Sequence, residues 1–260
     1  MNKRRSMRIQ YLSDLHLEHL KSRTMSVWIN LVMRVQAPVL LLCGDIGDPG
    51  HPSYEDFLSH MSVRFEKVFL LKGNHECYGK TPSTTDDCIQ KICARHPNIS
   101  FLQNSFEDYG GYRFAGTTLW SHVSDSHHVN NDFHMIRDMT IDSHNRLHQD
   151  AKDFIRSVLI TSPHPIIMMT HHLPSHKLTD PFYSRFSLYQ QCYSSDCDDL
   201  IRFPIHSWFY GHTHRPRIDI LNGVRTFCNP IGYTGENPSP SFDRTVDLTF
   251  TPPCSSAPRS

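Results

Sequence analysis

The stretch that decides the fold is residues 68–76, VFLLKGNHE, in which an apolar run stops at a loop of chemically active side chains. A run of four apolar residues followed closely by Gly73 predicts a buried strand that ends in a loop, and open α/β sheets place their ligand sites in such loops. Asn74 offers a carbonyl oxygen to a cation, and His75 offers a ring nitrogen or a proton. Alone, the loop also fits an ordinary polar turn, because glycine and asparagine are common turn residues.

The same pattern recurs at four other places along the chain. Apolar-rich strand candidates occupy residues 9–12, 39–43, 166–169 and 208–210. They are followed by SDLH at 13–16, GD at 44–45, THH at 170–172 and GHTH at 211–214. Five strand candidates that each deliver Asp, Asn or His just past their last apolar residue predict side chains that converge on one edge of a sheet.

Composition sets broad limits on function. The chain has 260 residues, of which 38% are hydrophobic and 20% charged, as in soluble globular proteins. Lys and Arg balance Asp and Glu at 26 each, which argues against capture of nucleic acid or an anionic membrane through the whole surface. No apolar run approaches the roughly 18–20 residues that a membrane-spanning helix needs. We expect a soluble, cytoplasmic protein with no membrane partner.

Eight cysteines are spread along the chain without a CxxC pair. This spread favours reduced thiols over a disulfide framework or a zinc knuckle. Cys192 and Cys197 are the one pair that would merit a test for metal or redox use.

The remaining pattern predicts one domain over residues 7–250, between a basic tail at 1–6 and a flexible tail at 251–260. Helical spacing is found at 25–35, 54–65, 84–95 and 142–160, and the first of these helices completes a βαβ unit. Further short strands are predicted at 99–102, 112–115 and 117–120, a hairpin around Asn222-Gly223, and an edge strand at 242–250. The polar stretches 121–140 and 174–195 are predicted to be long loops beside the site.

The order of the polar blocks resembles that of the calcineurin-like metallophosphoesterase superfamily. The matching blocks are Asp14-x-His16, Gly44-Asp45, Gly73-Asn74-His75-Glu76, His171 and Gly211-His212-Thr213-His214. Residues 117–121, 170–174 and 229–233 further resemble an uncharacterised, single-domain branch of that superfamily. The resemblance implies a four-layer α/β/β/α sandwich with mixed sheets and a site at the C-terminal ends of the strands.

The resemblance also implies a site with two divalent metal ions, Mn²⁺, Fe or Zn²⁺, which suit mixed nitrogen and oxygen ligands. Asp14, His16 and His214 would hold one ion, Asn74, His171 and His212 the other, and Asp45 would bridge both. Two cations about 3.5–4 Å apart can acidify a shared water. The implied reaction is therefore hydrolysis of a phosphomonoester or phosphodiester by a metal-bridging hydroxide.

Six further residues have less direct counterparts in the resemblance. His75 is implied to be a general acid or a cation that stabilises the transition state. Asp48 matches a carboxylate that orients this histidine in related phosphatases, although its Asp-Pro-Gly setting also fits a plain turn. His172 matches no ligand position, so it is either pocket wall or substrate contact. Asn131, Asp132 and His134 resemble a family loop that overhangs the site, but their sequence favours a solvated loop.

Two other functions remain open at this stage. The first is a non-catalytic metal-binding scaffold that recruits protein, although this chain shows no loss of ligands. The second is a metal-dependent nuclease, which the neutral net charge disfavours. Arg215, Arg217 and Arg225 could still grip an isolated phosphate. Substrate identity would depend on the two long loops, which contain no recognisable motif, and the sequence carries no signal for an oligomeric state.

Overall fold

Two sheets carry the fold of this protein, whose structure is a computed structural model that describes residues 5–19, 29, 32–124, 130–181, 183–185, 187–237 and 239–250. The first sheet has the strand order β11-β1-β2-β3-β4. Its strands are β1 (Arg5–Leu12), β2 (Val39–Cys43), β3 (Lys67–Leu71), β4 (Ile99–Phe101) and β11 (Thr245–Phe250). The first four are parallel, and β11 pairs antiparallel with β1 at the edge.

The second sheet has the order β5-β6-β7-β8-β10-β9. Its strands are β5 (Ser105–Tyr109), β6 (Tyr112–Thr117), β7 (Ile166–Thr170), β8 (Ile205–Tyr210), β9 (Arg217–Leu221) and β10 (Val224–Cys228). The four central strands are parallel, and β5 and β9 pair antiparallel at the two edges. Both sheets are therefore mixed, as expected from the sequence.

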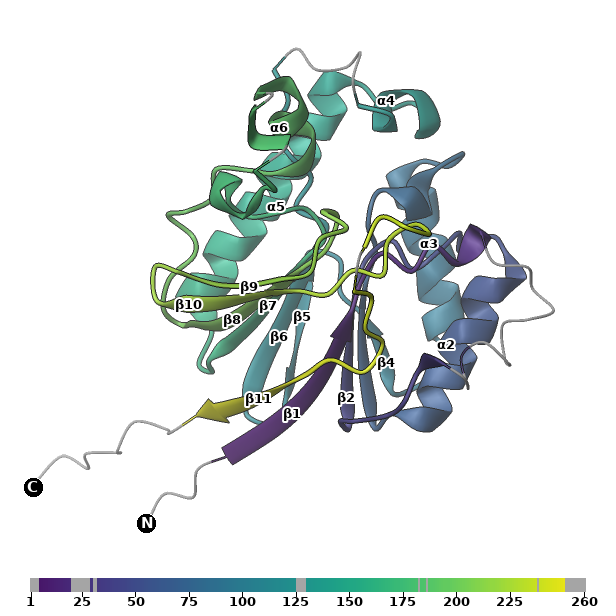
Figure 1. Cartoon of the computed structure of the whole chain (residues 1–260), viewed down its shortest axis with the longest axis vertical. Helices are drawn as coiled ribbons and strands as arrows, with labels where there is room; N and C mark the ends of the chain where they lie inside the picture. The colour runs from purple at the N-terminus through teal and green to yellow at the C-terminus, as the bar shows by residue number, and fades with distance from the viewer. Residues whose placement is uncertain are drawn as a thin grey trace, which may run out of the picture.

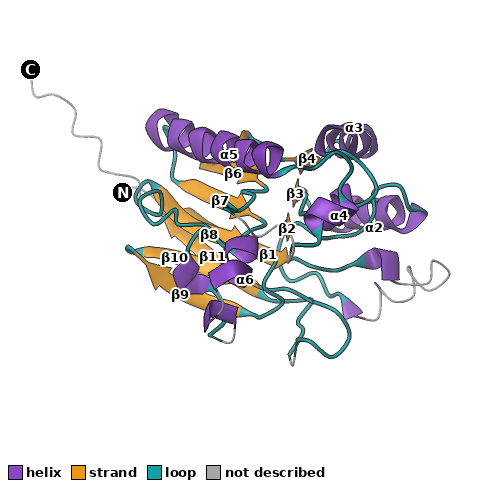
Figure 2. Ribbon diagram, turned by 90° about the horizontal axis from the view of Figure 1, so that it is seen from above, coloured by secondary structure: helices purple, strands orange, loops and turns teal. Residues whose placement is uncertain are grey.

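The three long helices cover the outer faces of the two sheets (Figures 1 and 2). The helices α2 (Pro52–Arg64) and α3 (Pro82–Cys93) contribute to a core with the first sheet, and α5 (Ile141–Thr161) contributes to a second core with the second sheet. A third core lies between the sheets, where the rings of Phe69 and Phe114 stack with centroids 4.1 Å apart. The predicted four-layer α/β/β/α sandwich is confirmed.

Three of the strands that lead to the predicted site are buried over their whole length. Every residue of β2, β3 and β7 is buried, which matches the uninterrupted apolar runs of their sequences. Among the described residues no helix is both long and apolar enough to span a membrane.

Some predicted elements differ from the structure. Residues 118–120 form no strand, because β6 ends at Thr117 and Leu119 adopts a left-handed backbone with φ of 56°. The strand β5 was not predicted, and the stretches 121–140 and 174–195 contain α4 (Asp132–Met135) and α6 (Ser187–Tyr193). The predicted helix at 25–35 falls mostly outside the described residues, as does the predicted tail 251–260. The strand β1 begins at Arg5, inside the predicted basic tail.

Candidate metal centre

The loops that follow five parallel strands meet at one edge of the sandwich. β1 leads to Asp14 and His16, β2 to Asp45, β3 to Asn74 and His75, β7 to His171, and β8 to His212 and His214. Backbone hydrogen bonds join neighbouring loops, with Asp14 N donating to Gly44 O at 2.9 Å and Gly211 N donating to His171 O at 3.0 Å. The structure thus brings together all seven residues that the sequence predicted as metal ligands.

Glycine allows two of these loops to approach each other closely. A Cβ atom on Gly73 would lie 2.2 Å from Oδ1 of Asp45 and 2.7 Å from Cε1 of His171. A Cβ on Gly44, which has φ of +87°, would lie 2.5 Å from Nδ1 of His171. Any side chain at either position would displace a predicted ligand.

The backbone at five of the seven predicted ligands is left-handed. The φ angles are 54° at Asp14, 48° at His16, 52° at Asp45, 68° at His212 and 49° at His214. Left-handed φ values are uncommon outside glycine and cost of order 1 kcal/mol per residue. Such strain is concentrated at functional sites, where the surrounding fold holds it in place.

The donor atoms fall into two groups. Asp14, His16 and His214 form one group and Asp45, His171 and His212 the other, and within each group the candidate donor atoms lie within 4.8 Å of one another. In the first group, Nε2 of His214 is 3.2 Å from Nε2 of His16 and 3.4 Å from Oδ1 of Asp14. The atom Oδ2 of Asp45 is 3.3 Å from Nε2 of His171 and 3.9 Å from Nε2 of His16, so it lies between the groups.

Three of the histidines present Nε2 to the centre and Nδ1 to an oxygen acceptor. Nδ1 of His171 is 2.9 Å from the Cys43 carbonyl oxygen, Nδ1 of His16 is 3.2 Å from Oε1 of Glu18, and Nδ1 of His214 is 2.5 Å from Oε2 of Glu236. An Nδ1–H bond to oxygen leaves the Nε2 lone pair available, which is the usual arrangement of metal-ligating histidines. The donor set therefore fits divalent cations.

The buried carboxylates create a strongly negative field at the donor groups. Burial opposes a charge on His171, but the Asp45 carboxylate outweighs that effect and raises the pKa of His171 to about 10. The Asp14 carboxylate likewise overcomes burial and raises the pKa of His214 to about 9. A divalent cation would replace these protons, since ligating histidines must be neutral.

The amide of Asn74 is oriented by a residue that the sequence placed in a solvated loop. Nδ2 of Asn74 donates to Oδ1 of Asp132 at 2.8 Å, which leaves Oδ1 of Asn74 at 3.1 Å from Nε2 of His171. Oδ1 of Asp132 also accepts from the Tyr78 hydroxyl at 3.1 Å. The expectation for Asp132 was wrong: its side chain is buried, at 2% exposure, because it serves two donors at the site. His134 in the same helix is exposed, as expected.

His75 lies at the rim, beside both donor groups. Its backbone N–H donates to Oδ1 of Asp45 at 2.9 Å, and its ring packs on the ring of Tyr78 with centroids 4.2 Å apart. The Nε2 atom is 3.4 Å from the Tyr233 hydroxyl, and the Nδ1 atom is 3.8 Å from Oε1 of Glu18. The carboxylates of Asp45 and Glu18 raise the pKa of His75 although burial alone would lower it.

Asp48 does not make the contact that was expected of it. Its Oδ1 accepts from Nζ of Lys80 at 2.6 Å and from the backbone N–H of Gly50 at 2.8 Å. The bond from Gly50 is explained by the turn interpretation of Asp48. The carboxylate that lies next to the His75 ring is that of Glu18. A catalytic role for Asp48 stays a prediction that these contacts do not support.

Glu76 links the two loops, although the sequence suggested no role for it. Its buried carboxylate accepts hydrogen bonds from the backbone N–H groups of Gly73 at 2.7 Å, Ile46 at 2.7 Å and Asp45 at 3.0 Å. Burial and the nearby Asp45 charge raise the pKa of Glu76 to about 8. The side chain thereby fixes the Asp45 loop against the Asn74 loop.

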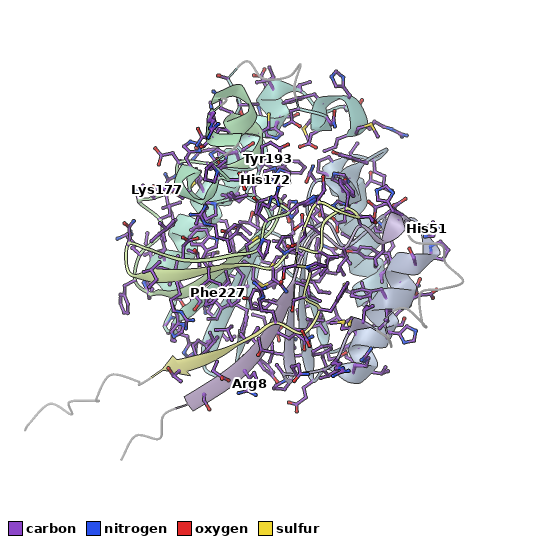
Figure 3. The ribbon with its side chains drawn as sticks, viewed as in Figure 1. Arg8, His51, His172, Lys177, Tyr193 and Phe227 are labelled. Atoms are coloured by element: carbon purple, nitrogen blue, oxygen red, sulfur yellow. The ribbon has the colours of Figure 1, made fainter. Side chains whose placement is uncertain are left out.

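His172 belongs to the wall behind the centre. In Figure 3 the labelled His172 and Tyr193 lie close together, and their rings contact the His212 ring with centroid distances of 4.2 and 5.0 Å. His172 is fully buried and packs on Trp120 at 5.6 Å. Of the two interpretations left open by the sequence, its burial favours the pocket wall.

A cavity of about 370 Å³ opens over the donor groups. Its walls include Asp45, Asn74, His75, Tyr78, Tyr193, His212, His214, Arg215 and Tyr233. Of the three arginines considered for phosphate binding, Arg215 lines this cavity, whereas Arg217 pairs with Asp219 and Arg225 lies over the Phe227 ring. Cys192 also lines the cavity, but Cys197 is buried in the core beneath α5.

Comparison with known proteins identifies the family. The family model for calcineurin-like phosphoesterases matches residues 7–216. The chain belongs to the calcineurin-like phosphoesterase family. The family assignment supports a hydrolase that acts on phosphate esters and binds metal ions.

Relatives of this calcineurin-like phosphoesterase include an uncharacterized protein of Acanthamoeba polyphaga mimivirus, which is 33% identical over 88% of this chain and 92% of that protein. Among solved structures, the phosphopantetheinyl hydrolase of Mycobacterium tuberculosis has a TM-score of 0.74 at 20% identity, covering 96% of this chain and 98% of that one. A dimetal phosphatase from Danio rerio has a TM-score of 0.54 at 13% identity, and the match covers 94% of this chain and 98% of that one. At these identities the two structures show a shared fold.

Proposed function

We propose that this calcineurin-like phosphoesterase hydrolyses a phosphomonoester or phosphodiester with the help of two divalent cations. The observation that carries the proposal is the pair of donor groups that share the Asp45 carboxylate, with His75 beside both. The first cation would be held by Asp14, His16 and His214 and the second by Asn74, His171 and His212. Mixed nitrogen and oxygen donors suit Mn²⁺, Fe or Zn²⁺.

When bound, such cations would acidify a water for attack and offset the charge of the phosphoryl group. The protein supplies the rest of the chemistry. Asp45 keeps the two donor groups together, and its Oδ1 also fixes the backbone of His75. The His75 ring faces the cavity, where its Nε2 can donate a proton to the leaving oxygen. Arg215 lines the same cavity and offers N–H donors to the phosphate.

The proposal is tested by reloading metal-free protein with Mn²⁺ and assaying p-nitrophenyl phosphate and bis(p-nitrophenyl) phosphate. Metal-dependent release of p-nitrophenol from either compound is expected. Turnover of the diester would define a phosphodiesterase, and turnover of the monoester alone would define a phosphatase. A protein that binds two cations per chain but hydrolyses neither compound would favour the scaffold interpretation.

Replacing His75 by alanine is expected to lower kcat by about 10²–10⁴-fold, the usual contribution of a positioned general acid. Binding of cations should persist, since the ring of His75 is not among the proposed ligands. The measurement is steady-state hydrolysis of an aryl ester of the preferred class, monoester or diester, whose phenol is less acidic than p-nitrophenol, together with the metal content per chain. Unchanged turnover in His75→Ala would exclude this histidine from the reaction.

Replacing Asp132 by alanine is expected to weaken binding of the second cation by about 10–100-fold, as for other residues that orient a metal ligand. Without the Asp132 carboxylate, the Asn74 amide loses the partner that turns its oxygen toward His171. Calorimetric titration with Mn²⁺ measures the effect. His134→Ala, in the same short helix α4, is the matched control because its side chain is exposed. Equal affinity in the Asp132 and His134 variants would contradict the expectation.

A further inference from the structure

Glu18 stands between two residues that the proposed function assigns to different tasks. It belongs to the short 3-10 helix η1 (Leu17–His19), which follows the loop of Asp14 and His16. Its Oε1 atom lies 3.2 Å from Nδ1 of His16 and 3.8 Å from Nδ1 of His75. The contact with His16 is a hydrogen bond, and the contact with His75 lies within ion-pair distance. One oxygen therefore faces the Nδ1 atoms of both rings.

The two rings that Glu18 contacts are themselves packed together. The ring centroids of His16 and His75 are 4.6 Å apart with an interplanar angle of 72°. With Nδ1 directed at Glu18, Nε2 of His16 faces His214 and Nε2 of His75 faces the Tyr233 hydroxyl at 3.4 Å. The hydrogen bond from Glu18 fixes the tautomer of His16, and the longer contact places Nδ1 of His75 on the side of the carboxylate, so Nε2 of each ring is directed away from Glu18.

The main chain holds Glu18 in this place. The backbone N–H of Leu17 donates to the Ile46 carbonyl at 3.0 Å, which ties η1 to the loop that carries Asp45. A Cβ atom on Gly47 would lie 3.0 Å from Cβ of Leu17 and 3.4 Å from Oε2 of Glu18, so the absence of a side chain there makes room for the carboxylate. The Oε2 atom is buried and has no hydrogen-bond partner among the described residues. The carboxylate is partly exposed, and its Oε1 lies closest to His16, at 3.2 Å, while Nδ1 of His75 and Nε2 of the exposed His19 are each 3.8 Å away.

We propose that Glu18 is a positioning residue that couples the metal centre to the general acid, because its Oε1 orients the ring of the ligand His16 and the ring of His75 together. This inference rests on the proposed function and extends it. It assigns to Glu18 the orienting task that the sequence suggested for Asp48, whose carboxylate binds Lys80 and Gly50 instead. Loss of the Glu18 carboxylate should therefore impair metal binding and proton donation at once.

The first test measures metal binding and needs no catalysis. Metal-free Glu18→Gln protein is titrated with Mn²⁺ beside the wild type and the control Glu55→Gln, whose carboxylate pairs with Arg95 on the surface of α2. We expect one of the two sites to bind about 10–100-fold more weakly in Glu18→Gln and both to be unchanged in the control. A third Mn²⁺ per chain that disappears in Glu18→Gln would instead make Glu18 a metal ligand and overturn the positioning role.

The second test measures proton donation at saturating Mn²⁺ with a series of aryl phosphates whose phenols differ in acidity. Glu18→Gln should lower kcat about 10–100-fold for the least acidic phenols and much less for p-nitrophenol, with KM nearly constant, because an acid catalyst matters most for a poor leaving group. In the His75→Ala protein, the additional change Glu18→Gln should not increase the dependence of kcat on the acidity of the phenol any further.

Two further outcomes overturn the inference: wild-type leaving-group dependence in Glu18→Gln, or unchanged affinity at both Mn²⁺ sites. If the wild-type protein hydrolyses no aryl phosphate, the proposed function fails, and the Mn²⁺ titration still decides whether Glu18 orients His16. Thermal unfolding of each variant verifies that it is folded. Glu18→Asp keeps the charge but shortens its reach, so it provides a second variant with the same expected losses if Glu18→Gln does not fold.

Discussion

Replacing Asp45 by asparagine is expected to lower phosphoester hydrolysis by at least about 10³-fold, equivalent to about 4 kcal/mol of transition-state stabilisation. Oδ2 of Asp45 lies between the two donor groups, at 3.3 Å from Nε2 of His171 and 3.9 Å from Nε2 of His16. A neutral amide at this point would remove the one negative charge that both cations share. The metal content should fall from two cations per chain to one or none.

Asparagine is the informative substitution because it preserves the fold of the loop. Oδ1 of Asp45 accepts the His75 backbone N–H at 2.9 Å, and the amide oxygen of asparagine can keep that bond. The control is Asp56→Asn, which changes an exposed residue of α2. Metal content by elemental analysis and kcat with p-nitrophenyl phosphate are the measurements. Two retained cations together with wild-type turnover in Asp45→Asn would refute the shared-carboxylate arrangement.

Acid is expected to destabilise the fold through two buried histidines outside the metal centre. The His144 ring lies between Trp120 and Phe133, with both centroid distances 5.3 Å, and its nitrogens have no partner among the described residues. Nδ1 of His148 contacts the carbonyl oxygen of Trp120. Burial lowers the pKa of each histidine from 6.5 to about 4. Both imidazoles are therefore neutral in the native protein at neutral pH.

The sign of the effect follows from proton uptake by the unfolded chain. Below pH 6.5 the unfolded histidines bind protons and the folded ones do not, so the stabilisation is complete above pH 6.5 and is lost as the pH falls toward 4. For a shift of this size the free energy of unfolding should drop by about 2 kcal/mol per histidine between pH 7.5 and pH 5. Urea denaturation of metal-free protein at the two pH values is compared between the wild type and a variant that lacks one of these histidines, because groups of the metal centre titrate as well.

The variant His144→Phe keeps an aromatic ring in the same packing and removes its titration. Its stability loss between pH 7.5 and pH 5 should be smaller than that of the wild type by about 2 kcal/mol. His134→Phe, at an exposed position, is the control and should show the wild-type loss. The expectation fails if the pH dependence of His144→Phe equals that of the wild type.

The sequence predicted the central strands well because their signal is local. An uninterrupted apolar run such as residues 39–43 or 166–169 allows few structures other than a strand covered on both faces, and both strands were found with nearly those limits. The edge strand β5 was missed because its sequence SFEDY alternates between partly buried and exposed residues, and its pairing with β6 depends on the turn at Gly110-Gly111. Trp120 was taken for a strand residue because it is apolar, but it is buried in a loop cluster with Cys77 and Ile136.

The convergence of the seven predicted ligands was readable for the same reason, since each follows a strand. Residues that act on those ligands were harder to find. Asp132 reaches Asn74 from a segment 58 positions away, and no local pattern marks that contact. Glu18 lies two positions after His16, yet its contact with His75 depends on how the β1 and β3 loops meet. Pairings between distant loops are set by the tertiary fold, so the sequence pattern alone did not reveal them.

The left-handed backbone at Asp14, His16, Asp45, His212 and His214 bears on which substitutions each position tolerates. Glycine adopts such angles without strain, whereas alanine keeps the strain and loses the contacts of the native side chain. A glycine variant at any of these five positions should therefore be more stable than the corresponding alanine variant. The comparison of the two variants separates the cost of the backbone conformation from the contribution of the side chain.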